Sequence, residues 1–176
     1  SFFTEPSNAS RTLLMNLNTC QWDKELLDFF SVELSSLPKI IDSFGQFGAT
    51  KGLSFLPDGI PITGILGDQQ AALFGQLGFF KGQMKCTYGT GAFLLLNTGH
   101  EIKKSKYGLL STVAYRMDGK AVYALEGSCY IAGAAVQWLR DNLKIISKSS
   151  EIEELALSVK SFHEMEHILF FPFFTG

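Results

Sequence analysis

The organisation of this chain is decided by one stretch, Ile62-Thr63-Gly64-Ile65-Leu66-Gly67-Asp68-Gln69-Gln70-Ala71-Ala72-Leu73. Residues 62–66 are short and apolar, which predicts a strand. The next four residues close that strand and open a helix, which we expect over 71–77. Asp68 therefore stands where a strand gives way to a helix. Open α/β sheets place their ligands at the carboxyl ends of strands, so Asp68 is the first candidate for chemistry.

Asp68 has two interpretations. An acid at this place can act as a general base on a hydroxyl that the pocket holds within hydrogen-bond reach. It can also do no more than cap the helix, because the helix dipole favours a negative charge at that end. On this feature alone, the second interpretation is favoured.

The pattern changes near residues 79–82, where helix gives way to sheet. Strands are predicted over 82–88 and 92–96, and the second is apolar on both faces, which is typical of a central strand. Residues 109–116 and 120–125 are predicted to form a hairpin, because Asp118-Gly119 between them is a strong turn dipeptide.

Gly89-Thr90-Gly91 is the tight turn between the first two of these strands. Its glycines let the backbone approach a ligand closely, and its N–H groups and the Thr90 hydroxyl can donate to phosphate oxygens. An ordinary hairpin turn also favours glycine. The turn is a candidate phosphate contact, although three residues alone are a weak signal.

A helix is predicted from Gly127-Ser128 to about Asn142, because its apolar residues keep a helical spacing. Gly133 inside it costs about 1 kcal/mol relative to alanine, so its presence needs a reason. Gly133 and Gln137 are four residues apart and share one face, which could seat a planar nucleoside. Close packing of the helix on a sheet explains the glycine at least as well.

Local patterns predict further elements along the chain. They are a buried strand over 11–18, a helix over 24–30 capped by Asp23, a glycine- and proline-rich connection over 45–61, a helix that begins with the capping-box pattern Ser150-Glu151-Ile152-Glu153, and a strand over 168–171.

Composition excludes several classes of protein. The 176 residues are 46% hydrophobic and 18% charged with a net charge of −2, which is enough apolar material for a core and rules out a disordered tail. This balance gives no electrostatic reason to expect a nucleic-acid partner, and no window reaches the roughly 18 apolar residues of a membrane span.

The three cysteines lack CxxC spacing, which predicts free thiols in a reducing compartment. No metal site is predicted, because the pair His163 and His167 lacks an HExxH pattern.

Taken in order, these segments resemble the glycerol kinases of the FGGY family of carbohydrate kinases. The specific blocks are Gly67-Asp68-Gln69-Gln70, within residues 64–76, and Thr87-Tyr88-Gly89-Thr90-Gly91-Ala92-Phe93. The match spans essentially the whole chain. Further matching segments are Ser7 to Thr12, Asn97-Thr98-Gly99, Tyr123 to Gly127, Ala132-Gly133-Ala134, Gln137 to Asp141 and Pro172 to Gly176.

The resemblance implies an α/β chain of the RNase H-like, actin-type ATPase fold with a cleft between two domains. Residues 1–79 would be the C-terminal part of the first domain, and residues 80–176 the N-terminal part of the second. The implied activity is ATP-dependent phosphorylation of glycerol to glycerol 3-phosphate, with Mg²⁺ as cofactor. The full-length protein would be cytoplasmic and a homo-oligomer.

The resemblance also implies a role for each matching site residue. Asp68 would be the general base that accepts the proton of the attacking terminal hydroxyl of glycerol, which suits phosphoryl transfer because that reaction needs positioning more than covalent chemistry. The other implied roles are contacts to glycerol by Gln69 and Phe93, contact to the transferring phosphates by Thr90, and contacts to the nucleotide by Gly133 and Gln137.

Two other functions stay open at this point. One is another kinase of the same family, acting on a substrate such as xylulose, gluconate or erythritol. The other is a non-catalytic nucleotide-binding module. The chain begins at Ser1 and ends on an apolar run closed by Gly176, which we interpret as cuts through a longer kinase. Because the first phosphate loop of the family would lie upstream, we expect the isolated chain to be inactive.

Overall fold

A computed structural model describes residues 2–174. They divide into two compact units, which we describe separately. The first comprises Ser1–Lys85 and Leu94–Gly127, and the second comprises Cys86–Phe93 and Ser128–Gly176. The two packing units do not meet at the domain boundary near residue 80 that the sequence suggests, because residues 94–127 pack with the N-terminal residues. That boundary stays a prediction.

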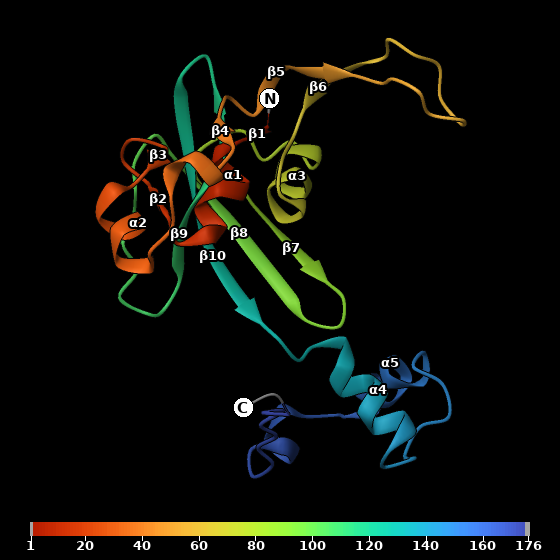
Figure 1. Ribbon diagram of the computed structural model, residues 1–176. Coiled ribbons are helices and arrows are strands. Elements are labelled where there is room, and N and C mark those ends of the chain that lie inside the picture. The colour runs from red at the N-terminus through yellow and green to blue at the C-terminus, as the bar shows by residue number, and fades with distance from the viewer. Residues whose placement is uncertain (1, 175–176) are drawn as a thin grey trace. The chain divides into compact units, whose positions relative to one another are not determined.

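Figure 1 labels the secondary-structure elements of both units. The α-helices are α1 (Pro6–Ala9), α2 (Lys24–Phe30), α3 (Asp68–Gly75), α4 (Gly133–Asp141) and α5 (Glu151–Ser158). Single 3₁₀ turns span Ser10–Thr12, Leu34–Ser36 and Phe162–Met165. The strands are β1 (Phe3–Thr4), β2 (Met15–Asn16), β3 (Gln21–Trp22), β4 (Lys39–Ile40), β5 (Phe44–Ala49), β6 (Pro61–Gly64), β7 (Met84–Tyr88), β8 (Ala92–Gly99), β9 (Leu110–Met117) and β10 (Lys120–Cys129).

A four-stranded sheet with the order β7-β8-β10-β9 forms the centre of the first unit. Strand β8 has a hydrogen-bonded neighbour on each side, which confirms the prediction of a central strand. Strands β9 and β10 are antiparallel and joined by the predicted two-residue turn. Both turn residues have positive φ, 50° at Asp118 and 72° at Gly119, the conformation that suits the twist of a hairpin.

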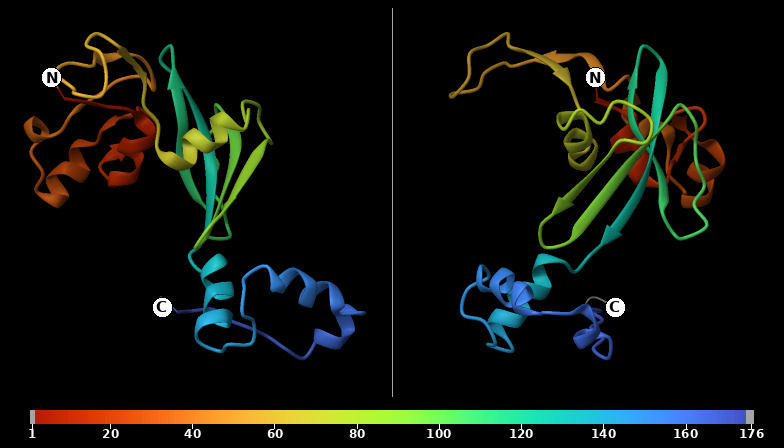
Figure 2. Two further views of the ribbon diagram at one scale, coloured as in Figure 1. Left: turned by 90° about the vertical axis from the view of Figure 1, so that its right-hand side faces the viewer. Right: turned by 180° about the vertical axis from the view of Figure 1, so that it is seen from behind.

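Each face of the β9–β10 hairpin packs against a different set of elements. Val113 and Tyr123 face a cluster built by the N-terminal segments, with Ala9, Met15, Cys20 and Ile40. Their neighbours in sequence, Ala114, Val122 and Ala124, face the opposite cluster with Leu73 of α3 and Leu95 of β8. Successive side chains of a strand point to opposite faces, so the alternation places the hairpin between α1 and α3 (Figure 2).

The N-terminal segments contain one confirmed prediction and one wrong one. Asp23 caps α2 by accepting hydrogen bonds from the backbone N–H groups of Glu25 and Leu26. The buried strand expected over 11–18 is reduced to β2, because Ser10–Thr12 form a 3₁₀ turn and Leu13 adopts a φ of 63°. The apolar run does not lie in the core as a whole, since Leu13 is 71% exposed.

The connection expected over 45–61 is partly ordered as a hairpin. Strands β5 and β6 pair antiparallel, and the hairpin extends away from the sheet (Figure 1). Helix α3 then begins at Asp68, three residues before the predicted start, so Asp68 belongs to the helix rather than preceding it.

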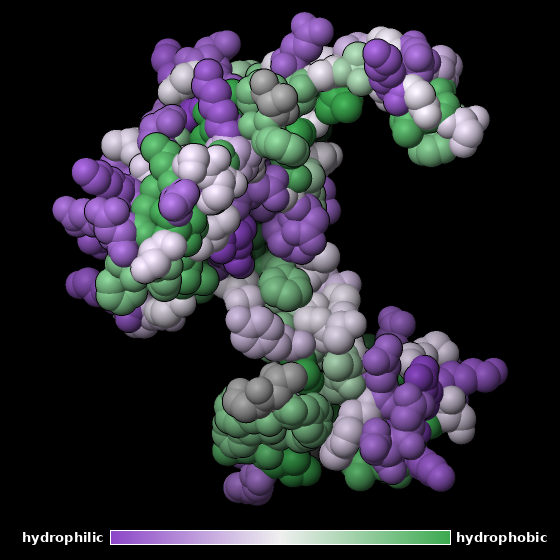
Figure 3. All heavy atoms as spheres, in the orientation of Figure 1, coloured by the Kyte–Doolittle hydropathy of each residue, from purple (hydrophilic) through white to green (hydrophobic). Residues whose placement is uncertain are grey.

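The second unit differs from the sequence predictions in three places. Helix α4 begins only at Gly133, because β10 continues to Cys129. Helix α5 begins after Ser150 as predicted, but the Ser150 side chain makes no cap hydrogen bond. The strand expected over 168–171 is wrong: these residues are not in a strand and are exposed, as part of the apolar surface in Figure 3.

Candidate functional site

Asp68 is the first residue of α3, and Gly67 is the residue that caps the helix. Gly67 has no side chain that could make the cap hydrogen bond. Oδ1 of Asp68 accepts a hydrogen bond of 2.8 Å from the backbone N–H of Gln69, which is one of the donors in the first helical turn, as the capping interpretation also predicts. Asp68 is exposed, which leaves its carboxylate accessible to a hydroxyl group.

Gln69 lies between Asp68 and a buried lysine of strand β7. Lys85 is only 2% exposed, and its Nζ donates a hydrogen bond to Oε1 of Gln69. Nε2 of Gln69 lies 3.4 Å from Oδ2 of Asp68. The Gln69 side chain therefore connects the carboxylate of Asp68 to the buried ammonium group of Lys85.

Sequence reasoning missed Lys85. Its neighbours Met84 and Cys86 alternate with it along a predicted strand, and a lysine in such a pattern is most often solvent-facing. Only the packing of α3 on this strand shows that the ammonium group is buried. No local signal could have found it.

Gln70, the next residue of the same block, is buried as well. It is 4% exposed, and its Nε2 has no hydrogen-bond partner among residues 2–174. Its Oε1 packs close to Gly67, where a Cβ would come within 2.7 Å of it. A buried amide donor without a partner costs about 1–3 kcal/mol, so this position is a source of instability next to Asp68.

In the second unit, the turn Gly89-Thr90-Gly91 is bonded to the start of α4. Thr90 O accepts hydrogen bonds from the backbone N–H groups of Ala132 and Ala134, at 2.8 and 3.1 Å, and Gly89 O accepts one from Gly133 at 2.9 Å. The N–H groups at the beginning of α4 therefore already donate their hydrogen bonds to the carbonyl oxygens of the turn. A phosphate contact would have to come from other donors, such as the exposed Thr90 hydroxyl.

Two glycines make this close approach possible. A Cβ on Gly133 would lie 2.5 Å from the backbone oxygen of Gly89, and a Cβ on Gly91 would lie 2.6 Å from that of Cys129. Both neighbours are backbone atoms that cannot rotate away. Close packing against the turn accounts for Gly133, the second of the two explanations that the sequence allows.

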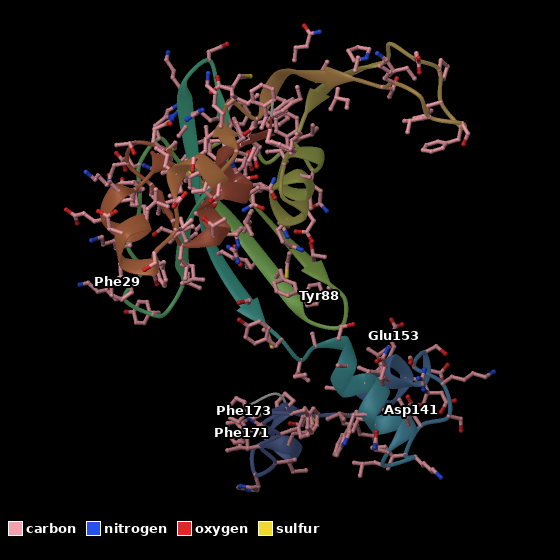
Figure 4. All side chains as sticks on the ribbon, in the orientation of Figure 1. Phe29, Tyr88, Asp141, Glu153, Phe171 and Phe173 are labelled. Atoms are coloured by element: carbon pink, nitrogen blue, oxygen red, sulfur yellow. The ribbon has the colours of Figure 1, made fainter. Side chains whose placement is uncertain are left out.

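The remaining candidates of the second unit lie near this turn in the sequence or on α4. Gln137 is exposed one helical turn after Gly133, and Phe93 is half-buried in β8. Tyr88 ends β7 just before the turn and is 81% exposed (Figure 4). A hydrogen bond with the Cys86 side chain raises the pKa of the Tyr88 hydroxyl.

The candidate residues thus fall into two groups, Asp68 with Gln69 in the first unit and the turn with α4 in the second. A cavity of about 640 Å³ in the first unit, lined in part by Phe79, Phe80 and Tyr115, contains none of them. Within the part of the chain that the structure describes, no three His, Cys, Asp or Glu side chains form a group that could hold a metal ion. None of the helices over that same part is long and apolar enough to cross a membrane.

Comparison with known protein families gives two matches that together span most of the chain. Residues 1–75 match the N-terminal domain of the FGGY family of carbohydrate kinases, and residues 84–176 match the C-terminal domain of that family.

The chain is also similar to curated glycerol kinases. It is 55% identical to those of Bdellovibrio bacteriovorus, over 174 residues, and of Myxococcus xanthus, over 175 residues. Each alignment covers 98% of this chain, but only 34% and 35% of the two relatives. The chain therefore spans about a third of the length of the curated relatives it matches.

Solved structures show the same fold. The Plasmodium falciparum glycerol kinase with ADP superposes with a TM-score of 0.82 at 44% identity, covering 90% of this chain and 32% of that one. A gluconate kinase from Lactobacillus acidophilus gives a TM-score of 0.68 at 20% identity, covering 89% of this chain and 32% of that one. The mixed α/β fold expected from the sequence, that of the actin-like ATPases, is thereby confirmed.

Proposed function

Because the chain belongs to the FGGY family of carbohydrate kinases, we propose that it is the central part of a longer enzyme that phosphorylates glycerol with ATP. We call this enzyme the parent protein. The product is glycerol 3-phosphate. The observation that carries the proposal is the exposed carboxylate of Asp68, ordered beside Gln69 and Lys85, in a chain 55% identical to glycerol kinases.

Asp68 acts as the general base in this proposal. Its carboxylate accepts the proton of a terminal hydroxyl of glycerol, and the oxygen forms its bond to the terminal phosphorus of ATP while the bond to ADP breaks. Gln69 holds a neighbouring hydroxyl, and Phe93 lines the glycerol pocket. What the structure supplies is an accessible carboxylate whose Oδ1 is already held by the backbone of Gln69.

The nucleotide is assigned to the second unit. The Thr90 hydroxyl contacts the transferring phosphates, and Gly133 and Gln137 line the site for the nucleoside. The turn fits this role, because its backbone is held in place by three hydrogen bonds from the start of α4.

Mg²⁺ is proposed to arrive with ATP, where it neutralises charge on the phosphate oxygens. Mg²⁺ is usually held by one or two carboxylates together with substrate phosphates, so a protein cage is not required. We further place the parent protein in the cytoplasm, in keeping with three free thiols, and as a homo-oligomer.

The test is a substrate panel with the purified parent protein and ATP. Glycerol should be phosphorylated with a kcat/KM at least tenfold above that for xylulose, gluconate or erythritol. Preference for one of the other three would make the protein a different kinase of the same family. Absence of phosphorylation with all four, while ATP still binds, would favour a non-catalytic nucleotide-binding module.

A further inference from the structure

A carboxylate far from Asp68 in the sequence is completely buried in the first unit. Glu5 is 0% exposed and precedes α1. Its oxygens accept hydrogen bonds from the backbone N–H groups of Ser7 and Asn8, at 2.9 and 2.7 Å, from Nδ2 of Asn8 at 2.8 Å, and from the hydroxyls of Ser7 and Ser43. Each of these donors is a neutral group. A buried carboxylate is tolerated only when its oxygens are satisfied in this way.

Ser7 connects the buried Glu5 carboxylate to Gly67, the residue before Asp68. Its hydroxyl donates to Glu5 and accepts a hydrogen bond of 2.8 Å from the backbone N–H of Gly67, which lies 60 residues away in the sequence. A hydroxyl has a single proton to donate. Because the Ser7 hydroxyl donates this proton in its hydrogen bond to Glu5, its lone pairs face the N–H of Gly67.

Ser43 makes a second connection to the same segment. Its hydroxyl donates to Glu5 at 2.7 Å, and its backbone oxygen accepts a hydrogen bond of 3.0 Å from the N–H of Ile65. Both ends of the short segment Ile65–Gly67 are therefore bonded to serines that the Glu5 carboxylate orders. Both serines are 0% exposed, so water does not compete for these bonds.

This segment decides where Asp68 points. Gly67 is the N-cap residue of α3 and has no side chain that could fix the start of the helix. The backbone of glycine is also more flexible than that of any other residue. We propose that Ser7, oriented by Glu5, is a positioning residue for the kinase reaction, which holds the Gly67 N–H and thereby the carboxylate of Asp68. The inference rests on the proposed role of Asp68 as base. A displacement of about 1 Å at a reacting group can cost about 100-fold in rate.

The experiment measures kcat and both KM values of the parent protein carrying Ser7→Ala. We expect kcat to fall about 10- to 100-fold while the KM for ATP stays within about twofold, because only the first unit is altered. Ser7→Thr keeps the hydroxyl and should restore kcat to within about threefold of the original. Ser7→Cys keeps the shape but offers a poor acceptor, so it should remain impaired and serves if Ser7→Ala does not fold.

Ser10 provides the matched control. Ser10→Ala removes a hydroxyl three residues away that bonds Ser7 O and the Thr112 hydroxyl but not Gly67. This variant should lower the Tm by an amount similar to Ser7→Ala and leave kcat within about threefold.

The outcomes separate this inference from the proposed function. An unchanged kcat in Ser7→Ala, or an equal loss of kcat in Ser10→Ala, overturns the positioning role. Asp68→Asn is measured in the same panel. If that variant keeps full kcat, the role of Asp68 itself is rejected; if it is inactive while Ser7→Ala is fully active, only the positioning role is rejected.

Discussion

The ammonium group of Lys85 donates a hydrogen bond to the side-chain oxygen of Gln69. A lysine has donors and no acceptor, so the oxygen of the amide, and not its nitrogen, faces Lys85. The Nε2 group is thereby turned toward Asp68, whose Oδ2 lies 3.4 Å away. Gln69 is left to offer an N–H donor, which suits the oxygen of a substrate hydroxyl.

The first prediction follows from this relationship. Lys85→Met should raise the KM for glycerol about tenfold, the equivalent of one lost hydrogen bond, because the Gln69 amide is then free to turn its oxygen to the substrate. The KM for ATP should stay within about twofold. Steady-state kinetics of the parent protein measure both constants.

Lys85→Arg is the matched variant for that measurement. It keeps a donor at the same position and should raise the KM for glycerol less than Lys85→Met does. A KM for glycerol that is the same in the Met variant and the original protein would show that Lys85 does not orient Gln69.

The second prediction concerns the contact between Gly133 and the turn. Gly133→Ala places a methyl group 2.5 Å from the backbone oxygen of Gly89, so the turn must move away from α4. We expect the KM for ATP to rise about tenfold or more with a smaller effect on the KM for glycerol. Gly75→Ala is the control, since nothing lies within 4 Å of the added methyl there. Equal KM values for ATP in the two variants would reject the role of this turn.

The third prediction concerns pH and the ion pair of Arg116 with Asp42. Burial raises the pKa of Asp42, but the hydrogen bonds from the Gly119 N–H and from Arg116, together with the Arg116 charge, outweigh it and lower the pKa below its model-peptide value of 3.8. A lowered pKa means that the unfolded chain binds the proton more readily. The stabilisation is therefore complete above the unfolded pKa and is lost as the pH falls through the folded one.

Asp42→Asn tests this linkage. The variant should lower the Tm at neutral pH, because it removes a charge-assisted bond of 2.6 Å that ties the β9–β10 hairpin to the N-terminal segments. The difference in Tm should stay constant from pH 7 to about 5 and narrow below about 4. A difference that is unchanged at pH 3.5 would contradict the assignment.

The sequence predicts best where a local rule has no competitor. Asp23 caps α2, and Asp118-Gly119 turns the β9–β10 hairpin, because capping and positive φ depend on neighbouring residues alone. The strand-to-helix change before Asp68 is also local, but β6 pairs with β5 in an antiparallel hairpin and not with the four-stranded sheet, so the expected place of Asp68 at the end of a strand in an open sheet is wrong.

Tertiary packing decides the elements that the sequence predicts wrongly. The segment 11–18 carries an apolar run, yet Leu13 takes a left-handed conformation and leaves the core. Residues 128–129 extend β10 rather than beginning α4, because pairing in the sheet overrides helical spacing. Residues 168–171 are a further example, because their apolar run does not form a strand.

The supporting residues of the candidate site could not be predicted at all. Lys85 and Glu5 are ordinary surface residues by composition, and both are buried only because segments far apart in the sequence meet. Their partners, Gln69 and Ser43, lie 16 and 38 residues away from them. A single sequence holds no signal for such pairs.

The central claim is that Asp68 is the base for phosphorylation of glycerol. The direct measurement is kcat for Asp68→Asn in the parent protein, with the dissociation constant for ATP measured in parallel. We predict that kcat falls about 10²- to 10⁴-fold while ATP binds within about twofold of the original affinity, because the amide keeps the shape but cannot accept the proton. A kcat for glycerol that is unchanged in Asp68→Asn would contradict the claim.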